Sequence, residues 1–395
     1  MPAQPNPLMN LRVLFINPGR ELGGAEQSLL LLLEALRERD VDPTVALFGD
    51  GPFAARLVSQ TIATVFLDVP DAVRRASRYR AARGLGAAGL AARSLPSVAR
   101  LAALVRRGGH QLVHTNGLKA HLLGGLAGRL ARRPVVWHLR DFPPSGSRGR
   151  LFRAASRTLP ALVFANSEAV AATLRGVPVV RLYNPVDLER FHPDRSGAGI
   201  RAELALPENA PLVGMVAHLT KWKGHEDFIR IALRLSEQVP GVRFLVAGGP
   251  IYETEGHEGY AESLKRRTVD LGLAGRVLFL GARDDIPEIL AATDVLLHCP
   301  TAPEPFGRVV AEAMAAGRPV VAANAGGIPE IVEHDVTGLL VTSGDVSGFA
   351  AAVQRLLADP ALRHSLGAAG RRRAEQLFAV GPHAERVLRA YKEIT

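Results

Sequence analysis

Residues 294–324 read DVLLHCPTAPEPFGRVVAEAMAAGRPVVAAN, and this stretch decides the fold. It opens with an apolar run, passes through the loop PEPFG into helix-forming residues from about Gly307, and closes with a second apolar run. Gly317 and Pro319 mark the end of the helix. A strand, a helix and a second strand in this order predict two parallel strands joined by a right-handed crossover.

Short apolar runs alternate with helical segments along nearly the whole chain, and they form two series. The first series is LRVLFIN, TVALF, ATVFLDV, QLVHTN, PVVWHL, ALVFAN and VVRLY. The second is PLVGMVAHL, VRFLVAGG, VLFLG, DVLLHC, RPVVAAN and TGLLVT. Runs this apolar are typical of strands buried on both faces. We therefore predict an α/β protein with two Rossmann-like, doubly wound parallel-sheet domains that face a central cleft.

The chain of 395 residues is long enough for two domains, and a Pro/Gly-rich stretch separates the two series. This stretch, NPVDLERFHPDRSGAG, predicts a linker at about 185–199. The N-terminal domain is then residues 1–184 and the C-terminal domain residues 200–380. We expect a final helix at about 381–395 to return to the N-terminal domain.

The positive charge of the chain lies almost entirely in its first half. The net charge is +10, yet residues 1–190 hold 26 Lys+Arg against 13 Asp+Glu. Residues 70–157 hold 18 basic residues, and their acidic residues are Asp71 and Asp141. Such a segment favours an anionic partner, either a membrane surface or a lipid-phosphate acceptor. Arginines on solvated helix faces are the plain alternative. Nucleic acid is not expected, because few aromatic residues stand among the arginines.

The composition also limits the compartment and the cofactors. Cys299 is the single cysteine, so the chain can form neither an internal disulfide nor a multi-thiolate metal site. The N-terminus MPAQPNPLMN has no signal-peptide pattern, and no apolar run approaches the length of a membrane span. We expect a cytoplasmic protein, with peripheral attachment to the inner membrane face as an option.

Two motifs that suggest cofactors lie in the wrong context. Gly84, Gly86 and Gly89 match the dinucleotide pattern G-x-G-x-x-G, but no strand precedes them and no acidic residue follows at the required distance. Asp40 and Asp42 resemble a paired-aspartate metal site, but they lie in a helix-to-strand turn, where Asp is common. We expect neither a bound dinucleotide cofactor nor a metal ion.

The loop PEPFG and the helix after it combine an anion site with two carboxylates. The backbone amides at Phe306 and Gly307 lie at a helix N-terminus, where unpaired N–H groups attract a phosphate. Glu304 precedes the helix and Glu312 follows one turn into it. Carboxylates accept hydrogen bonds from adjacent sugar hydroxyls. A phosphate site beside two carboxylates predicts a sugar-nucleotide ligand, although each Glu taken alone is better explained as a solvated surface residue.

Motifs spread over nearly the whole chain resemble the retaining glycosyltransferases of family 4, which have the two-domain GT-B fold. The longest is EPFGRVVAEAMAAGRPVVAANAGGIPEIVEHDVTGLLV. GGAEQSL, VFANSEAV, YNPVDLERFHP, VAHLTKWKGHEDFI, VAGGP and VLFLGARDDIPEIL precede it in the order of the family. The resemblance implies transfer of a sugar, with retention of configuration, from a nucleoside diphosphate sugar to an acceptor hydroxyl.

The resemblance also implies roles for individual residues of the C-terminal half. Glu312 would bind the ribose, and Glu304 would bind hydroxyls of the transferred sugar. The backbone from Phe306 through Gly307 to Arg308 would contact the donor's sugar and phosphate. Lys223 in KWKG would contact the diphosphate.

The chain departs from the family pattern at one residue of this region. The family often has an arginine where this chain has His218. Either a protonated His218 lies beside the phosphates, or Lys221 and Lys223 supply the positive charge.

The N-terminal half offers two candidate regions. WHLRDFPP ends a strand at the place where the family has a histidine near the reacting sugar, which favours His138. Arg140 with Asp141, or a purely structural role for the Trp-His pair, are the alternatives left open. Gly23 and Gly24 follow the first strand, and their N–H groups are suited to the diphosphate or the acceptor. A simple helix-entry turn is the other interpretation.

We expect an enzyme without a cofactor in which the nucleoside diphosphate sugar is a co-substrate. Lys223 and helix N-terminal amides would stabilise the leaving diphosphate in place of a metal ion. The pathway would be cell-surface polysaccharide or glycolipid synthesis. A sugar-nucleotide epimerase, or a non-catalytic glycolipid- or polysaccharide-binding protein, are the alternatives, because one fold supports many functions.

Overall fold

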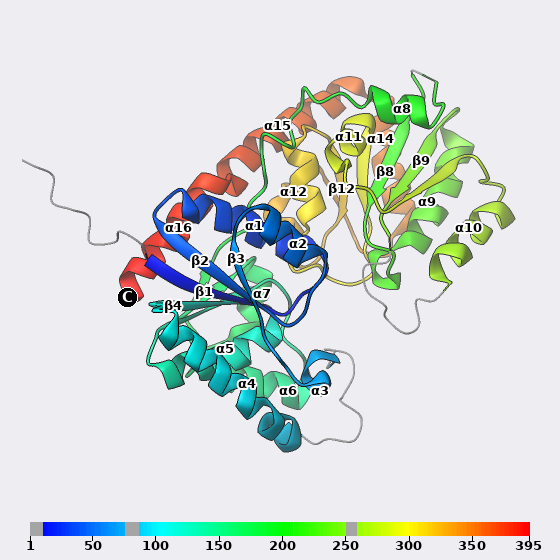
Figure 1. Ribbon diagram of the computed structural model, residues 1–395. Coiled ribbons are helices and arrows are strands. Elements are labelled where there is room, and N and C mark those ends of the chain that lie inside the picture. Colours follow the sequence, from blue (N-terminus) through cyan, green and yellow to red (C-terminus); the bar gives the residue numbers. More distant parts are fainter. Residues whose placement is uncertain (1–10, 76–86, 208, 250–258) are drawn as a thin grey trace, which may run out of the picture. The chain divides into compact units, whose positions relative to one another are not determined.

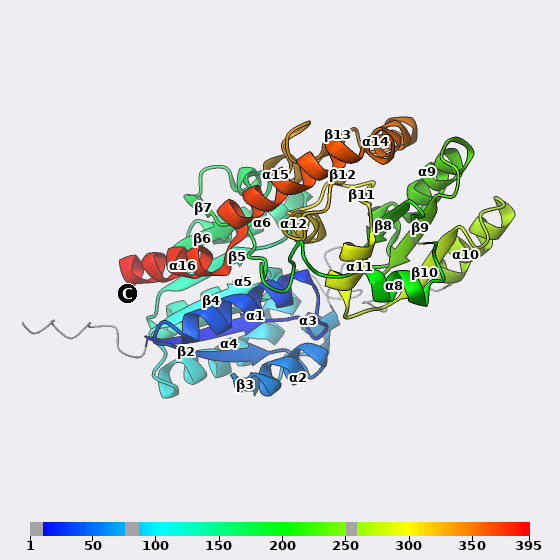
Figure 2. The ribbon, with the colours of Figure 1, turned by 90° about the horizontal axis from the view of Figure 1, so that it is seen from above.

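The computed structural model describes residues 11–75, 87–207, 209–249 and 259–395. The chain divides into two compact units. Unit 1 comprises residues up to Pro185 together with Val380–Thr395, and unit 2 comprises Val186–Ala379. Each unit is built around one parallel sheet (Figures 1 and 2).

The sheet of unit 1 has seven strands in the order β3-β2-β1-β4-β5-β6-β7, and every pairing is parallel. The order turns back at β1, with β2 on one side and β4 on the other, as in a doubly wound sheet. In chain order the strands are β1 (Leu11–Asn17), β2 (Val41–Leu47), β3 (Ala63–Phe66), β4 (Leu112–Asn116), β5 (Val135–Leu139), β6 (Leu162–Ala165) and β7 (Val179–Arg181).

Helices cover both faces of this sheet, and alternate residues of each strand point to opposite faces. On β1, Val13 and Phe15 pack with the helices α1, α2 and α16, while Leu14 and Ile16 pack with α4, α5 and α6. Figure 1 shows α1 and α2 on one side of the sheet and α4, α5 and α6 on the other. The helices are α1 (Gly24–Arg37), α2 (Pro52–Ser59), α3 (Asp71–Arg75), α4 (Ala87–Arg107), α5 (Leu118–Ala131), α6 (Gly146–Ser156), α7 (Glu168–Ala171) and α16 (Val380–Ile394).

The sheet of unit 2 has six strands in the order β10-β9-β8-β11-β12-β13, again parallel throughout. The strands are β8 (Leu212–Val216), β9 (Arg243–Ala247), β10 (Val277–Gly281), β11 (Val295–His298), β12 (Val320–Ala323) and β13 (Leu339–Val341). The helices are α8 (Ala198–Glu203), α9 (His225–Gln238), α10 (Tyr260–Asp270), α11 (Ile286–Ala292), α12 (Arg308–Ala315), α13 (Ile328–Ile331), α14 (Val346–Ala358) and α15 (Pro360–Phe378).

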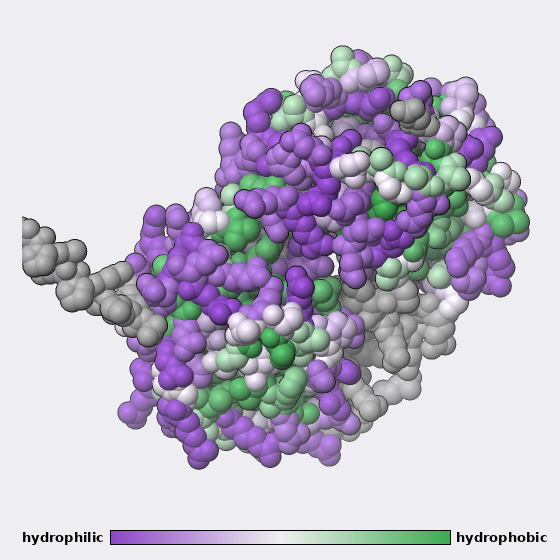
Figure 3. Space-filling view, turned by 45° about the horizontal axis from the view of Figure 1, so that its top comes forward, coloured by the Kyte–Doolittle hydropathy of each residue, from purple (hydrophilic) through white to green (hydrophobic). Residues whose placement is uncertain are grey.

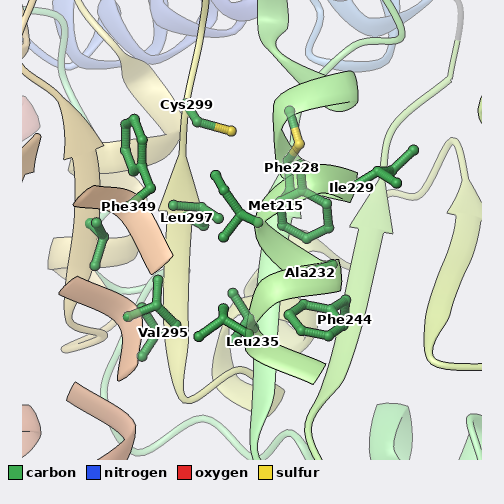
Figure 4. Close-up of a cluster of buried hydrophobic side chains, with 14 of the residues drawn as sticks. Met215, Phe228, Ile229, Ala232, Leu235, Phe244, Val295, Leu297, Cys299 and Phe349 are labelled. Carbon is green, nitrogen blue, oxygen red and sulfur yellow. The ribbon is translucent and has the colours of Figure 1, made fainter. Parts of the chain in front are cut away.

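A large apolar core fills one face of this second sheet. Phe228, Ala232 and Leu235 of α9 lie against Val295 and Leu297 of β11 (Figure 4). Cys299 is buried at the edge of the same cluster, and burial raises the pKa of its thiol. Hydrophilic side chains cover most of the face seen in Figure 3, with hydrophobic atoms gathered in smaller patches.

The predicted fold class is confirmed: there are two Rossmann-like parallel sheets, and each predicted apolar run overlaps an observed strand, although β2 begins at Val41, before the run TVALF. Residues 186–199, which the composition suggested as a linker, pack on unit 2. Val186 bridges to Ala379, and a Cβ atom at Gly197 would lie 2.2 Å from the backbone nitrogen of Ala292. The stretch is irregular in secondary structure but is held by these contacts.

The two motifs set aside in the sequence fall in different places. Gly84 and Gly86 lie outside the described residues, and Gly89 is part of α4. Asp40 has a left-handed φ of 59° in the turn before β2, whereas Asp42, which was also predicted to lie in this turn, belongs to β2 and pairs with Arg12 of β1. No helix in the described part of the chain combines the length and apolarity that a bilayer span needs.

Candidate functional site

In unit 2, two loops that follow neighbouring strands are held together by their backbones. The loop KWKG follows β8, and the segment from Cys299 follows β11. The N–H of Thr301 donates to the carbonyl of Trp222 at 2.8 Å. Gly224 has a φ of 82°, and a Cβ atom there would lie 1.8 Å from the carbonyl oxygen of Cys299. Only glycine fits this crossing, which fixes Lys223 beside the second loop.

Three side chains meet at one carboxylate oxygen of Glu304. The ammonium of Lys223 lies 2.5 Å from its Oε1, and the Nε2 of His298 lies 3.1 Å from the same atom. All three side chains are largely buried, with exposed fractions of 17% for Lys223 and 8% or less for the other two. Burial alone would raise the pKa of Glu304, but the charges of Lys223 and His298 and their hydrogen bonds hold it well below the usual value. Glu304 is therefore a carboxylate at neutral pH.

His218 lies close enough to this cluster for its titration to be affected. Burial and the charge of Lys223 lower the pKa of His218 to about 4, against the opposing effect of Glu304. The imidazole is neutral at pH 7 in this setting.

The N-terminus of α12 lies directly after Glu304. Gly307 caps this helix with a φ of 95°, and a Cβ atom there would lie 2.1 Å from the Cδ1 of Ile328. The side chain of Phe306 is buried and packs edge-on against Phe378, at a centroid distance of 5.6 Å. Phe306 thus has only its backbone to offer a ligand. The first amides of α12 have no acceptor within the helix, which suits an anion.

Glu312 is held in the next turn of the same helix. The Nε of Arg308 donates to its Oε1 at 2.6 Å, in an i,i+4 pair. Both side chains are largely buried, with exposed fractions of 13% and 9%. The structure therefore brings Lys223 to Glu304 and Arg308 to Glu312, so each of the two carboxylates predicted to bind the nucleotide sugar contacts a cationic side chain.

In unit 1, the residues after β1 lead directly into α1. Gly23 is the N-cap residue and Gly24 the first residue of the helix, and no side chain caps this end. Glu26 in the first turn is buried, and its Oε1 accepts from the Nδ2 of Asn17 at 3.3 Å. Burial raises the pKa of Glu26, although this hydrogen bond and the charge of Arg140 oppose the rise.

A buried hydrogen-bonded network follows the carboxyl ends of β1, β4 and β5. The Nδ2 of Asn116 donates to the Oδ1 of Asn17 at 2.8 Å, and the Nε of Arg140 donates to the Oδ1 of Asn116 at 2.7 Å. Arg140 also donates to the side chain of Asn184. The network spans the gap between β1 and β4, where the strand order reverses and ligands of doubly wound sheets bind.

His138 lies one step inside this network and has no exposed surface. Its Nδ1 is 3.4 Å from the Nη2 of Arg140, while its Nε2 has no hydrogen-bond partner. The ring stacks on His383 of α16 at a centroid distance of 6.2 Å. Burial and the charge of Arg140 hold the pKa of His138 well below the ordinary value, so the imidazole is neutral.

His138 and Arg140, the two alternatives left open at WHLRDFPP, therefore differ in how deeply they are buried. Arg140 is 8% exposed and lies after the end of β5, whereas His138 belongs to the strand and is fully enclosed. Asp141 is exposed. Trp137 points to the opposite face and stacks on His121 at 5.2 Å, so Trp137 and His138 do not form one structural pair.

Several residues of these clusters were missed in the sequence. Asn17, Glu26, Asn184 and His298 were not predicted as site residues. Each of Asn17, Asn116 and His298 is the last residue of its strand. A polar residue closing an apolar run at the ligand-binding edge of a sheet was the available signal.

Family models match both units. The C-terminal model, described as glycosyl transferases group 1, matches residues 198–373. The N-terminal model, described as glycosyltransferase family 4, matches residues 22–190.

Curated relatives match over part of their length. The chain is 30% identical over 213 residues to an N-acetyl-alpha-D-glucosaminyl L-malate synthase of Bacillus anthracis, covering 54% of this chain and 52% of that protein. It is 35% identical over 221 residues to a D-inositol 3-phosphate glycosyltransferase of Saccharomonospora viridis, covering 54% and 50%. The chain thus spans about half the length of these curated relatives.

A solved structure matches over its whole length. Anabaena Alr3699/HepE in complex with UDP and glucose has a TM-score of 0.83 and 30% identity, covering 97% of this chain and 100% of that one. The same protein in complex with UDP-glucose gives a TM-score of 0.82. On these matches, the chain belongs to the group 1 glycosyltransferases of family 4 type and has their GT-B fold.

Proposed function

We propose that the protein is a retaining glycosyltransferase that moves a hexose-type sugar from a UDP-sugar to an acceptor hydroxyl. The observation that carries this proposal is the cluster of Lys223, His298 and Glu304 beside the N-terminus of α12. It combines a cation, an anion-binding helix end and an ionised carboxylate, which are the groups that a sugar diphosphate needs. The similarity to the UDP and UDP-glucose complexes of HepE supports the choice of uridine.

On this proposal, unit 2 binds the donor. The diphosphate contacts Lys223 and the amides from Phe306 to Arg308, and the ribose hydroxyls donate to Glu312. Hydroxyls of the transferred sugar donate to Glu304. Gly23 and Gly24 of unit 1, at the start of α1, are assigned to the diphosphate or the acceptor, because a helix N-terminus favours a negatively charged or hydrogen-bond-accepting ligand.

The reaction forms one bond to the anomeric carbon and breaks another. The acceptor oxygen attacks this carbon from the face that the diphosphate leaves, so the configuration is retained. The electrons of the broken carbon–oxygen bond stay on the diphosphate, and its oxygen takes the proton of the acceptor hydroxyl. Lys223 and the α12 amides stabilise the charge that develops on the leaving group. The proposal assigns this task to the chain's own cation and dipole, without a metal ion.

The acceptor is assigned to unit 1. The network of Asn17, Asn116 and Arg140 offers amide and guanidinium groups that bind hydroxyls, with His138 directly behind it. We place Arg140 nearest the reacting sugar, with His138 behind it in contact with the guanidinium. The acceptor would be a growing polysaccharide or a lipid-linked sugar at an anionic membrane, on the cytoplasmic side where nucleotide sugars are made.

A thermal-shift panel tests the donor site first. UDP, GDP, ADP and their sugar conjugates are compared with and without EDTA, on the wild type and on Glu312→Ala. A ligand that binds only the folded protein raises Tm by mass action. We expect a shift with uridine nucleotides that EDTA leaves unchanged and that Glu312→Ala greatly reduces. Glu237→Ala, an exposed position of α9, is the matched control.

Product analysis then separates transfer from the other activities. NMR of the product should show the anomeric configuration of the donor, and UDP should be released only when an acceptor is present. Conversion of the sugar nucleotide without any acceptor would instead indicate an epimerase. A thermal shift without turnover for any acceptor tried would indicate a binding protein. No shift with any nucleotide would overturn the donor-site assignment.

A further inference from the structure

The two helical layers of unit 1 differ in charge. The helices α4, α5 and α6 pack on one face of the sheet and contain no Asp or Glu. Exposed arginines are numerous in and directly after them: Arg93, Arg100, Arg106, Arg107, Arg129, Arg132, Arg133, Arg148, Arg150 and Arg157. On the opposite face, α1 and α16 and the residues next to them expose both signs, as Arg37 with Glu38 and Glu385 with Arg386 show. The positive surface therefore belongs to one layer.

Leucines form a row on the outside of the middle helix of this layer. Leu122, Leu126 and Leu130 of α5 follow each other at intervals of four, so they lie on one side of the helix. Their exposed fractions are 40%, 45% and 51%. Arg129 and Arg133 are exposed beside them. The row is apolar, and its exposed neighbours are basic.

The inner side of α5 explains why these leucines point outward. Its buried residues are mostly glycine and alanine. A Cβ atom at Gly124 would lie 2.5 Å from the Cγ2 of Thr115, and one at Gly128 would lie 2.2 Å from the Cγ2 of Val135. The helix therefore lies so close to β4 and β5 that large side chains have no space beneath much of it. A helix that faces water normally places leucine inward and polar residues outward, and α5 shows the reverse on its exposed side.

We propose that the α4–α5–α6 layer docks on an anionic lipid bilayer, with the leucine row of α5 at the level of the acyl boundary. Leucine side chains in that position leave water, and the surrounding arginines reach the lipid phosphates. Glu and Asp, which the bilayer would repel, are absent from these three helices. The exposed leucines and arginines support bilayer docking whether or not the proposed function holds. Only the purpose of docking, which is to bring unit 1 to a lipid-linked acceptor, rests on the proposed function.

Two other occupants fit this surface less well. A nucleic acid would contact the arginines but not the exposed leucines. It would also need exposed aromatic rings on which bases can stack, and Trp137 and Phe152 of this layer are buried. A second copy of the chain would bury the leucines, but it would also bring two arginine-rich surfaces of the same sign together.

Vesicle flotation tests the proposal with the full chain. Vesicles of phosphatidylcholine alone are compared with vesicles that also contain phosphatidylglycerol, at low and high salt. We expect flotation with the anionic vesicles, weakened by salt because arginine–phosphate attraction is screened. The triple variant Leu122→Gln, Leu126→Gln, Leu130→Gln should lose most of this binding at the same salt. Glutamine is a good helix former, so α5 should remain folded.

The controls separate this outcome from the alternatives. Val58→Gln, on α2 of the opposite layer and 64% exposed, should float like the wild type. All variants should keep the wild-type Tm and its shift with UDP, which tests the donor site separately. Flotation of the triple variant equal to the wild type would overturn the proposal. Binding of the wild type to heparin or an oligonucleotide, but not to vesicles, would also overturn it. The same holds if substitution of the leucine row only converts a dimer into monomers in sedimentation.

Discussion

The carboxyl ends of the two sheets present different chemistry. In unit 2 the contacts are ionic: Lys223 meets Glu304 and Arg308 meets Glu312. In unit 1 the corresponding edge carries the side-chain amides of Asn17 and Asn116 and the guanidinium of Arg140, joined by hydrogen bonds. Glu26 is the carboxyl group beside them, and burial raises its pKa. A diphosphate needs cations, whereas a hydroxyl-rich acceptor needs neutral donors and acceptors. On the proposed function, this difference fits a donor bound by unit 2 and an acceptor bound by unit 1.

The largest expected effect is on acid stability. Burial lowers the pKa values of five histidines of unit 1, namely His110, His114, His121, His138 and His383. For His121 and His383 the pKa in the folded protein is about 3, against an ordinary value of 6.5. Between these values the unfolded chain binds more protons, so the stability present above pH 6.5 falls as the pH falls. Each such histidine contributes a slope of about 1.4 kcal/mol per pH unit.

This acid effect should be stronger in unit 1 than in unit 2, where burial chiefly lowers the pKa values of His218 and His225, each to about 4. Trp137 lies in unit 1 and Trp222 in unit 2, and they are the two tryptophans of the chain. In Trp222→Phe, fluorescence reports the melting of unit 1 alone, and calorimetry reports both units. Equal loss of stability by the two units between pH 6.5 and 4.5 would contradict the expectation.

The next effect concerns the cation of unit 2. Lys223→Ala removes the positive charge that would stabilise the leaving diphosphate. We expect kcat/KM to fall about 100-fold to 1,000-fold, the loss typical of removing one hydrogen-bond donor to the transition state. Lys221→Ala, in the same loop, is the comparison and should lower kcat/KM much less, because it is Lys223 that contacts Glu304. An equal loss in both variants would mean that the loop acts through its general charge and not through the contact with Glu304.

A smaller effect is expected at the network of unit 1. Arg140→Lys keeps the charge but loses the planar fork that contacts Asn116, Asn184 and His138. We expect kcat/KM for the acceptor to fall about 10-fold to 100-fold, the range for hydrogen bonds to a charged group, with donor binding unchanged. Arg175→Lys, an exposed position of the same unit, is the control. A greater loss in His138→Gln than in Arg140→Lys would assign the sugar contact to His138 itself.

The smallest effect is expected at His298, which positions Glu304. His298→Leu removes one of the two partners of the Oε1 atom, while Lys223 remains. We expect the KM for the sugar nucleotide to rise about tenfold, as for one buried hydrogen bond, with UDP binding unchanged. His298→Gln keeps a donor and should restore much of the affinity. Weakened binding of UDP itself in His298→Leu would show a general disturbance of the loop.

The sequence by itself determined the two sheets and the outline of the donor site. Strands buried on both faces must be apolar along their whole length, so each appears as a continuous run whatever its neighbours are. The cap at Gly307 and the end at Gly317 are equally local, because backbone geometry there favours glycine. Lys223, Glu304 and Glu312 were predicted as single residues from their motifs, and their roles remain a proposal.

Only the tertiary structure decided which of these residues meet. Lys223 and Glu304 are 81 positions apart, and their contact depends on β8 and β11 being neighbours in the sheet. The network of Asn17, Asn116 and Arg140 likewise joins three strands. The outward leucines of α5 depend on how closely that helix approaches β4 and β5. Local patterns reflect the backbone preferences of a segment, whereas contacts and exposure depend on what packs against it.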